Sequence, residues 1–135
     1  NPETAGEAYN YLGFMWADHN QHLEEAEDYI KKALATDPDN GAYLDSLGWV
    51  DYRRGNYEQA LAELLNAAQA LKEDDPTVFT HIGDTYEKLN QIPKALEYWQ
   101  KALALDKSDK KLAEKIEHYK TKVSKGEPAG ATPLP

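Results

Sequence analysis

The middle of the chain reads LDSLGWVDYRRGNYEQALAELLNAA over residues 44–68, and its pattern returns before and after this stretch. An apolar residue followed by glycine occurs three times, 35 residues apart, at Leu12-Gly13, Leu47-Gly48 and Ile82-Gly83. Two sets of alanines follow at intervals of 34 and 35: Ala26, Ala60 and Ala95, then Ala33, Ala67 and Ala102. A period of this length predicts stacked supersecondary units, whose continuous surface favours binding over catalysis.

Each repeat is expected to form two helices, because apolar residues recur at three- and four-residue spacings on both sides of a short polar break. We predict a lead-in at residues 1–5 and repeats at 6–40, 41–75 and 76–109. A seventh helix at residues 110–123 has lysines on one side and an apolar stripe on the other, made of Leu112, Ile116, Tyr119 and Val123. This stripe predicts a cap over the second helix of the third repeat, near Leu96, Trp99 and Leu103. Residues 124–135 are rich in Gly and Pro and are expected to form a flexible tail.

The repeats resemble the tetratricopeptide repeat over residues 6–109. The residues that carry the resemblance are aromatic or large apolar residues (Tyr9, Trp16, Phe79, Tyr86, Trp99), the Leu-Gly or Ile-Gly pairs, Gly55 and the periodic alanines. The resemblance implies an all-α solenoid of three helix pairs plus a C-terminal capping helix, in a right-handed superhelix. Within that fold the glycines and alanines are predicted at close helix contacts, and the large residues between the helices.

Three positions depart from the family pattern. Asn20 and Asn90 stand where a turn glycine is usual, and an Asn can adopt the left-handed conformation that such a turn needs. Asp51 stands where an apolar residue is usual, and pairing with a nearby cation is the only role that the sequence offers it. Residues 44–60 also look like the C-terminal repeats of large bacterial tetratricopeptide proteins, some of them envelope lipoproteins. This implies a bacterial scaffold or adaptor, cytoplasmic or periplasmic, and a fragment of a larger protein.

Little in the sequence points to catalysis. There is no cysteine, the eight glycines are too scattered for a phosphate-binding loop, and no serine–histidine–acid order stands out. His19 and His22, with Glu25, could bind a metal if the backbone were helical through their turn, although such histidines are more often plain surface. We therefore expect no enzyme, no cofactor and no metal site.

The charge of the chain bears on its partners. The net charge is −9, made of −12 over residues 1–106 and +3 over residues 107–135. An acidic body repels phosphate backbones, which disfavours nucleic acid and favours a basic or neutral peptide, although solubility alone would also explain the acidity. No apolar run approaches the ~20 residues that cross a bilayer, so no membrane insertion is expected.

The resemblance implies a concave groove lined by the first helix of each repeat. The groove positions are Asn10, Phe14, Asp45, Trp49, Tyr52, Arg53, Thr80, His81, Asp84 and Lys88. The repeat pattern does not require the aromatics Phe14, Trp49 and Tyr52, so they either anchor a peptide or pack on their neighbours. The cations with which some family members clamp acidic chaperone C-termini are missing here, so an extended apolar or weakly basic segment is the expected ligand.

Two functions remain open from the sequence. The first is a protein-interaction adaptor or scaffold that binds a peptide or a partner surface. The alternative is a structural or self-associating segment of a longer solenoid with no dedicated peptide ligand. In addition, residues 128–135 are predicted to lie against a tetratricopeptide surface, their own or a neighbour's, which would allow self-association through the tail.

Overall fold

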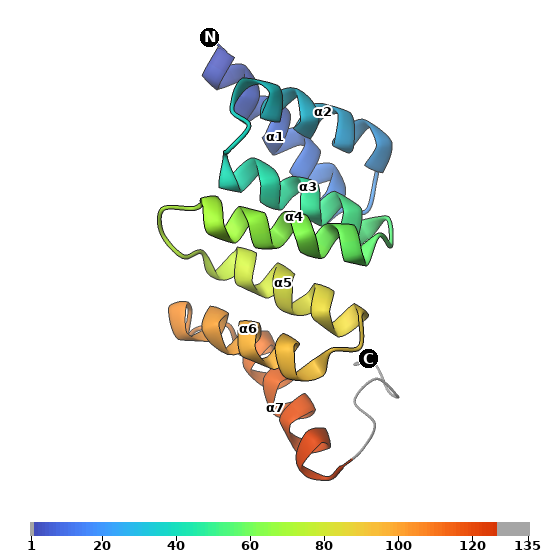
Figure 1. Ribbon diagram of the computed structural model, residues 1–135, viewed down its shortest axis with the longest axis vertical. Helices are drawn as coiled ribbons and strands as arrows, with labels where there is room; N and C mark the ends of the chain where they lie inside the picture. The colour runs from blue at the N-terminus through green and yellow to red at the C-terminus, as the bar shows by residue number, and fades with distance from the viewer. Residues whose placement is uncertain (1, 127–135) are drawn as a thin grey trace. The chain divides into compact units, whose positions relative to one another are not determined.

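A computed structural model describes residues 2–126, which form seven α-helices and no strand (Figure 1). The helices are α1 (Pro2–Asp18), α2 (Leu23–Thr36), α3 (Gly41–Arg53), α4 (Tyr57–Ala70), α5 (Pro76–Lys88), α6 (Ile92–Leu105) and α7 (Lys110–Ser124). The prediction of an all-α chain with three helix pairs and a seventh helix is confirmed. Residues 2–5, expected as a lead-in, belong to α1. The predicted tail contact falls on residues 128–135, outside the described part of the chain, and the sense of the superhelix stays a prediction.

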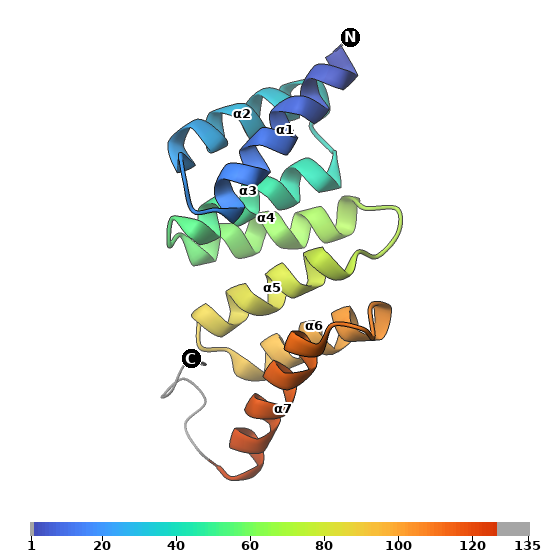
Figure 2. The same ribbon diagram turned by 180° about the vertical axis from the view of Figure 1, so that it is seen from behind.

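The chain divides into two compact units, residues 1–74 and 75–135. In the first unit, α1 packs against α2 and α3 against α4, and α3 also contacts both α1 and α2. In the second unit, α5 packs against α6, and α7 packs against α6 (Figure 2).

The turn inside each helix pair contains a residue with left-handed backbone. These residues are Asn20, Gly55 and Asn90, with φ of 54°, 86° and 60°, and they lie 35 residues apart. The expectation that Asn replaces glycine in this conformation is therefore confirmed. Short polar side chains begin the next elements: the carboxylate of Asp75 accepts from the Thr77 N–H at 2.8 Å, and Asp109 accepts from the Leu112 N–H at 3.1 Å.

The repeat glycines lie where two helices come closest. A Cβ added to Gly48 would stand 2.7 Å from Cγ of Leu64, and one added to Gly83 would stand 2.3 Å from Cδ1 of Trp99. All six periodic alanines are fully buried. The predicted packing role of these small residues is confirmed, since any larger side chain would hold the two helices apart.

Helix α7 covers α6, as predicted. Leu112, Ile116 and Tyr119 are buried in one cluster with Trp99 and Ala102. Val123, which the sequence placed in the same stripe, is 49% exposed, so the covering face ends at Tyr119. Val123 is exposed because it lies in the last turn of α7, next to the end of the helix at Ser124.

Polar contacts also fasten α7 to α5. The Lys115 ammonium lies 3.1 Å from Oδ1 of Asp84 and 3.0 Å from Oε1 of Glu87, and the Tyr119 hydroxyl donates to Oε2 of Glu87 at 2.6 Å. Burial alone would lower the pKa of Lys115, but the two carboxylates outweigh it and raise that pKa. Lys115 therefore stays charged, and it holds two acidic side chains of α5.

Candidate functional site

An aromatic cluster lies on the first helices of the first unit, α1 and α3. The Trp49 and Tyr52 rings are stacked, with centroids 4.4 Å apart and planes 10° apart. The Arg53 guanidinium lies 5.0 Å from the Trp49 ring centroid, and its Nη2 donates to the carbonyl oxygen of Asp18 at 3.0 Å. Phe14, on α1, packs against the hydrophobic core to which Trp49 belongs. These contacts fix the side chains before any ligand arrives.

The members of the cluster differ in exposure. Trp49 is only 7% exposed and belongs to the core with Ile30 and Val50, so it can form the floor of a binding surface. Phe14 and Tyr52 are half-buried. Packing is thus part of the role of all three predicted aromatics, and a ligand would meet mainly Phe14 and Tyr52.

Polar side chains lie one helical turn from these rings. Asn10 precedes Phe14 by four residues on α1, and Asp45 precedes Trp49 by four residues on α3, so each pair shares a helix face. Asp45 is buried. The buried Oδ1 of Asn10 accepts no hydrogen bond from the described residues. A donor such as a peptide N–H would satisfy it.

The four predicted groove residues of the third repeat lie in the second unit. The Thr80 hydroxyl donates to the Pro76 carbonyl oxygen at 2.9 Å, His81 is buried and Lys88 is exposed. Asp84 accepts from Nε1 of Trp99 at 3.0 Å in addition to its ion pair with Lys115. Its carboxylate is therefore committed to α6 and α7. The ligand-binding role of these residues stays a prediction.

Asp51 corrects one expectation, because its partner is an acid and not a cation. It is buried on α3 and hydrogen-bonded to Glu63 of α4, and burial together with this second carboxyl raises the pKa of Glu63 to about 8. Near neutral pH, Glu63 therefore carries a proton, and its carboxyl group can donate a hydrogen bond to Asp51. The neighbouring cation, Arg54, instead pairs with Glu27 at 2.6 Å. Burial raises the pKa of Glu27, but Arg54 and Lys31 outweigh it and lower that pKa.

The repeat register could have revealed this pair. The equivalent positions hold rings in the other two repeats, Trp16 against Tyr29 with centroids 5.2 Å apart and Tyr86 against Tyr98 with centroids 5.7 Å apart. The second repeat thus replaces an aromatic contact by two carboxyl groups.

The three candidate metal ligands do not form a metal site, although two of them are adjacent. His22 has a φ of 48°, so the turn is not helical, as a metal site there would have required, and its Nδ1 lies 2.8 Å from Oε2 of Glu25. Among residues 2–126, no group of three or more His, Cys, Asp or Glu side chains could hold a metal ion.

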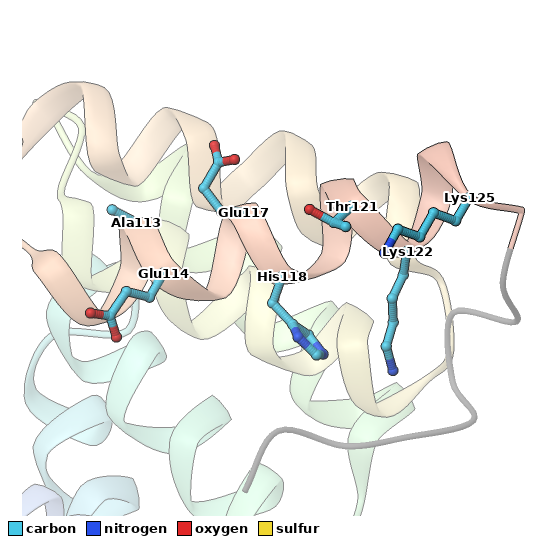
Figure 3. Close-up of a pocket in the computed structure, with 7 residues that line it drawn as sticks. All are labelled: Ala113, Glu114, Glu117, His118, Thr121, Lys122 and Lys125. Carbon is cyan, nitrogen blue, oxygen red and sulfur yellow. The ribbon is translucent and has the colours of Figure 1, made fainter.

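A surface hollow of about 610 Å³ runs along α7 (Figure 3). Its lining includes Glu114, Glu117, His118 and Lys125. All the described lining residues come from α7 and from Lys125 directly after it, and one helix cannot surround a ligand, so we assign the hollow no function.

The comparison with known proteins identifies the repeats. A profile of the tetratricopeptide repeat matches residues 4–114. The chain belongs to the tetratricopeptide repeat family. The TPR repeat-containing protein PA4667 of Pseudomonas aeruginosa is 39% identical over 77 residues, which are 57% of this chain and 13% of that protein. The type IV pilus assembly protein PilF of the same organism is 32% identical over 89 residues, or 65% of this chain and 35% of PilF. The chain thus spans a minor part of each of these relatives.

Solved tetratricopeptide structures have the same architecture. The TPR2AB domain of yeast Sti1, in complex with pHSP90, superposes with a TM-score of 0.76 at 24% identity, over 91% of this chain and 49% of that one. YrrB, described as a TPR protein with an unusual peptide-binding site, superposes with a TM-score of 0.69 at 25% identity, over 80% and 55%. None of the helices described here is long and apolar enough to span a membrane.

Proposed function

We propose that this chain is a non-catalytic protein-interaction module of a bacterial adaptor or scaffold, and that α1 and α3 bind an extended peptide or a partner segment. The observation that carries the proposal is the preformed group of Trp49, Tyr52 and Arg53 on α3, with Phe14 of α1 packed against the same core. Rigid aromatic side chains with one exposed edge and a neighbouring guanidinium are the groups that most often anchor a protein ligand. The family supports the same function, since the tetratricopeptide protein YrrB has an unusual peptide-binding site and the Sti1 domain forms a complex with pHSP90.

The charge of the first unit favours an apolar or weakly basic ligand. Residues 1–74 contain fifteen acidic and five basic side chains, a net charge of −10. This field repels an acidic peptide and attracts a basic one. Asp45, one turn before Trp49, adds a carboxyl group close to the cluster. We therefore do not extend the pHSP90 ligand of Sti1 to this chain.

The proposal is tested with an array of 12-residue peptides that differ in apolar, Lys and Glu content, followed by calorimetric titration of the peptides that bind. Apolar and weakly basic peptides are expected to bind, and Glu-rich peptides are not. Tyr52→Ala and Phe14→Ala should each weaken binding about ten-fold, which corresponds to about 1.4 kcal/mol.

The matched control is Tyr29→Ala, which removes a half-buried tyrosine from α2. Trp49→Ala is unsuitable because it would also empty the core. If Phe14→Ala and Tyr52→Ala leave the peptide affinity unchanged but Tyr29→Ala abolishes binding, the peptide does not bind on α1 and α3. If the chain binds no peptide, the alternative is favoured that it is a structural segment of a longer solenoid. An exposed face of α1, described below, bears on this alternative.

A further inference from the structure

One side of α1 carries an uncharged stripe at the surface. Its residues recur at three- and four-residue spacings along the helix: Ala5, Ala8, Tyr11, Leu12 and Met15. Tyr11 is 68% exposed and Leu12 is 37% exposed. Two adjacent large side chains at the surface of a helix indicate a face that another element covers.

The same stripe is buried on α3. The equivalent positions 35 residues later are Tyr43, Ser46, Leu47 and Val50, of which Tyr43 is 5% exposed, Ser46 3% and Val50 fully buried. They are covered by the preceding helix pair: the Tyr43 hydroxyl lies beside Gly6, and Val50 packs with Ala26 and Ile30.

Helices α5 and α7 bury the equivalent stripe as well. On α5 the equivalent residues are Val78, His81, Ile82 and Thr85, all buried. On α7 they are Leu112, Ile116 and Tyr119, which pack on α6 of the preceding pair. Within residues 2–126, α1 therefore differs from α3, α5 and α7 in leaving this stripe exposed.

We propose that the α1 stripe is the docking face for a further tetratricopeptide helix pair, which would cover α1 as α1 and α2 cover α3. The structure shows what covers the stripe on two helices. The stripe of α3 contacts the pair α1 and α2, and the stripe of α7 contacts α6 of the preceding pair. We therefore favour a helix pair, and not a second copy of the chain, as the element that covers α1. In a longer protein the occupant would be a preceding repeat, and the two Pseudomonas relatives are long enough to contain one. This interaction is separate from the peptide surface on α1 and α3.

A helix pair copied from the chain itself can serve as the added pair in an experiment. The α1 stripe matches that of α5 in size, with a small residue (Ala8 or Val78), a large ring (Tyr11 or His81) and an aliphatic residue (Leu12 or Ile82) in order. Residues 41–75 form the pair that precedes α5 in the sequence, so a copy of them placed directly before Gly6 keeps the 35-residue period. A second extended chain carries a copy of residues 6–40 at the same place, because that pair is the one seen to receive α3.

The test compares the original chain with both extended chains, each with and without Leu12→Lys or Tyr11→Lys. Helicity should rise on extension, and at least one extended chain should unfold in a single transition at higher temperature. In that chain each substitution should lower Tm by about 4 °C or more, but in the original chain by only about 1 °C, because only the extended chain buries the new charge. Leu105→Lys, at a leucine of α6 that is 49% exposed, is the matched control and should have the same small effect in every chain.

Three outcomes would overturn the proposal. The first is that the added pair stays unfolded in both extended chains. The second is that the substitutions have equal effects in the original and the extended chains. The third is that the original chain forms a dimer that Leu12→Lys dissociates, since a second copy would then be the occupant. Peptide binding by the Leu12→Lys variant is expected to be unchanged, which separates this test from that of the proposed function.

Discussion

At the scale of single residues, the left-handed turn positions give a direct test. Asn90 has a φ of 60°, and its side chain is exposed. Asn90→Ala should destabilise the fold by about 1 kcal/mol, because a Cβ without a local polar group disfavours this conformation, whereas Asn90→Gly should be close to neutral. Urea unfolding measures both effects. The neighbouring exposed Gln91→Ala is the control, and equal stability of Asn90→Ala and the original chain would contradict the prediction.

A second residue-scale prediction concerns the close helix contacts. Gly48→Leu and Ala60→Leu should each destabilise by roughly 1–3 kcal/mol, because both positions lie between α3 and α4 with no room for a larger side chain. Ala62→Leu, at an exposed position of α4, should change the melting temperature little. An unchanged melting temperature for Gly48→Leu would mean that α3 and α4 can separate there at no cost.

At the scale of helix pairs, the proton that Glu63 holds beside Asp51 predicts a pH dependence. The pKa of Glu63 is raised from 4.5 to about 8 in the folded chain, so the folded state keeps a proton that the unfolded state releases. The stability that this proton provides is complete below about pH 4.5, and it is lost as the pH rises through about 8.

Glu63→Gln should remove this contribution, because an amide does not titrate. Its unfolding free energy should fall less than that of the original chain between about pH 5 and about pH 9. Asp51→Asn should act in the same direction, and Glu58→Gln, at an exposed position of α4, should leave the profile unchanged. Identical pH profiles for Glu63→Gln and the original chain would show that Glu63 does not stay protonated near neutral pH in the folded chain.

The cap is the second prediction at this scale. Deleting residues 110–135 should expose the face of α6 that holds Trp99 and Ala102, so the shortened chain should aggregate or bind a hydrophobic dye. Deleting residues 127–135 alone leaves α7 in place and serves as the control. A monomeric chain of unchanged stability after the longer deletion would show that α7 is no cap.

At the scale of the whole molecule, the net charge of −9 should make peptide binding depend on salt. We expect the affinity for a weakly basic peptide to fall roughly three-fold or more between about 50 mM and about 500 mM salt, as screening weakens the attraction. An uncharged apolar peptide of equal length is the control and should bind equally at both concentrations. If binding of the basic peptide does not depend on salt, its affinity comes mainly from the aromatic contacts and not from charge.

The repeat made the architecture predictable, since small residues 34 or 35 apart can only be explained by helices that meet at regular intervals. Trp49 shows where this reasoning stops, because the pattern left open whether it anchors a peptide or packs on its neighbours, and in the structure it is buried in a core with Ile30 and Val50. For Asp51 the sequence pointed to a cation, whereas its partner Glu63 is twelve residues away on the next helix. Aligning this pair with the rings of the other repeats would have shown that the two side chains meet.

The pattern of helix contacts also bears on how the chain reaches its fold. Within each of the two units, the contacts between helices join neighbours or next-but-one neighbours in the sequence, such as α1 and α3. Chains with such local contacts pay little loop-closure entropy before they gain packing, so they fold fast. The first helix pair can therefore form during synthesis before α7 has left the ribosome. In the first unit, α3 and α4 would then assemble on a surface that α1 and α2 already form.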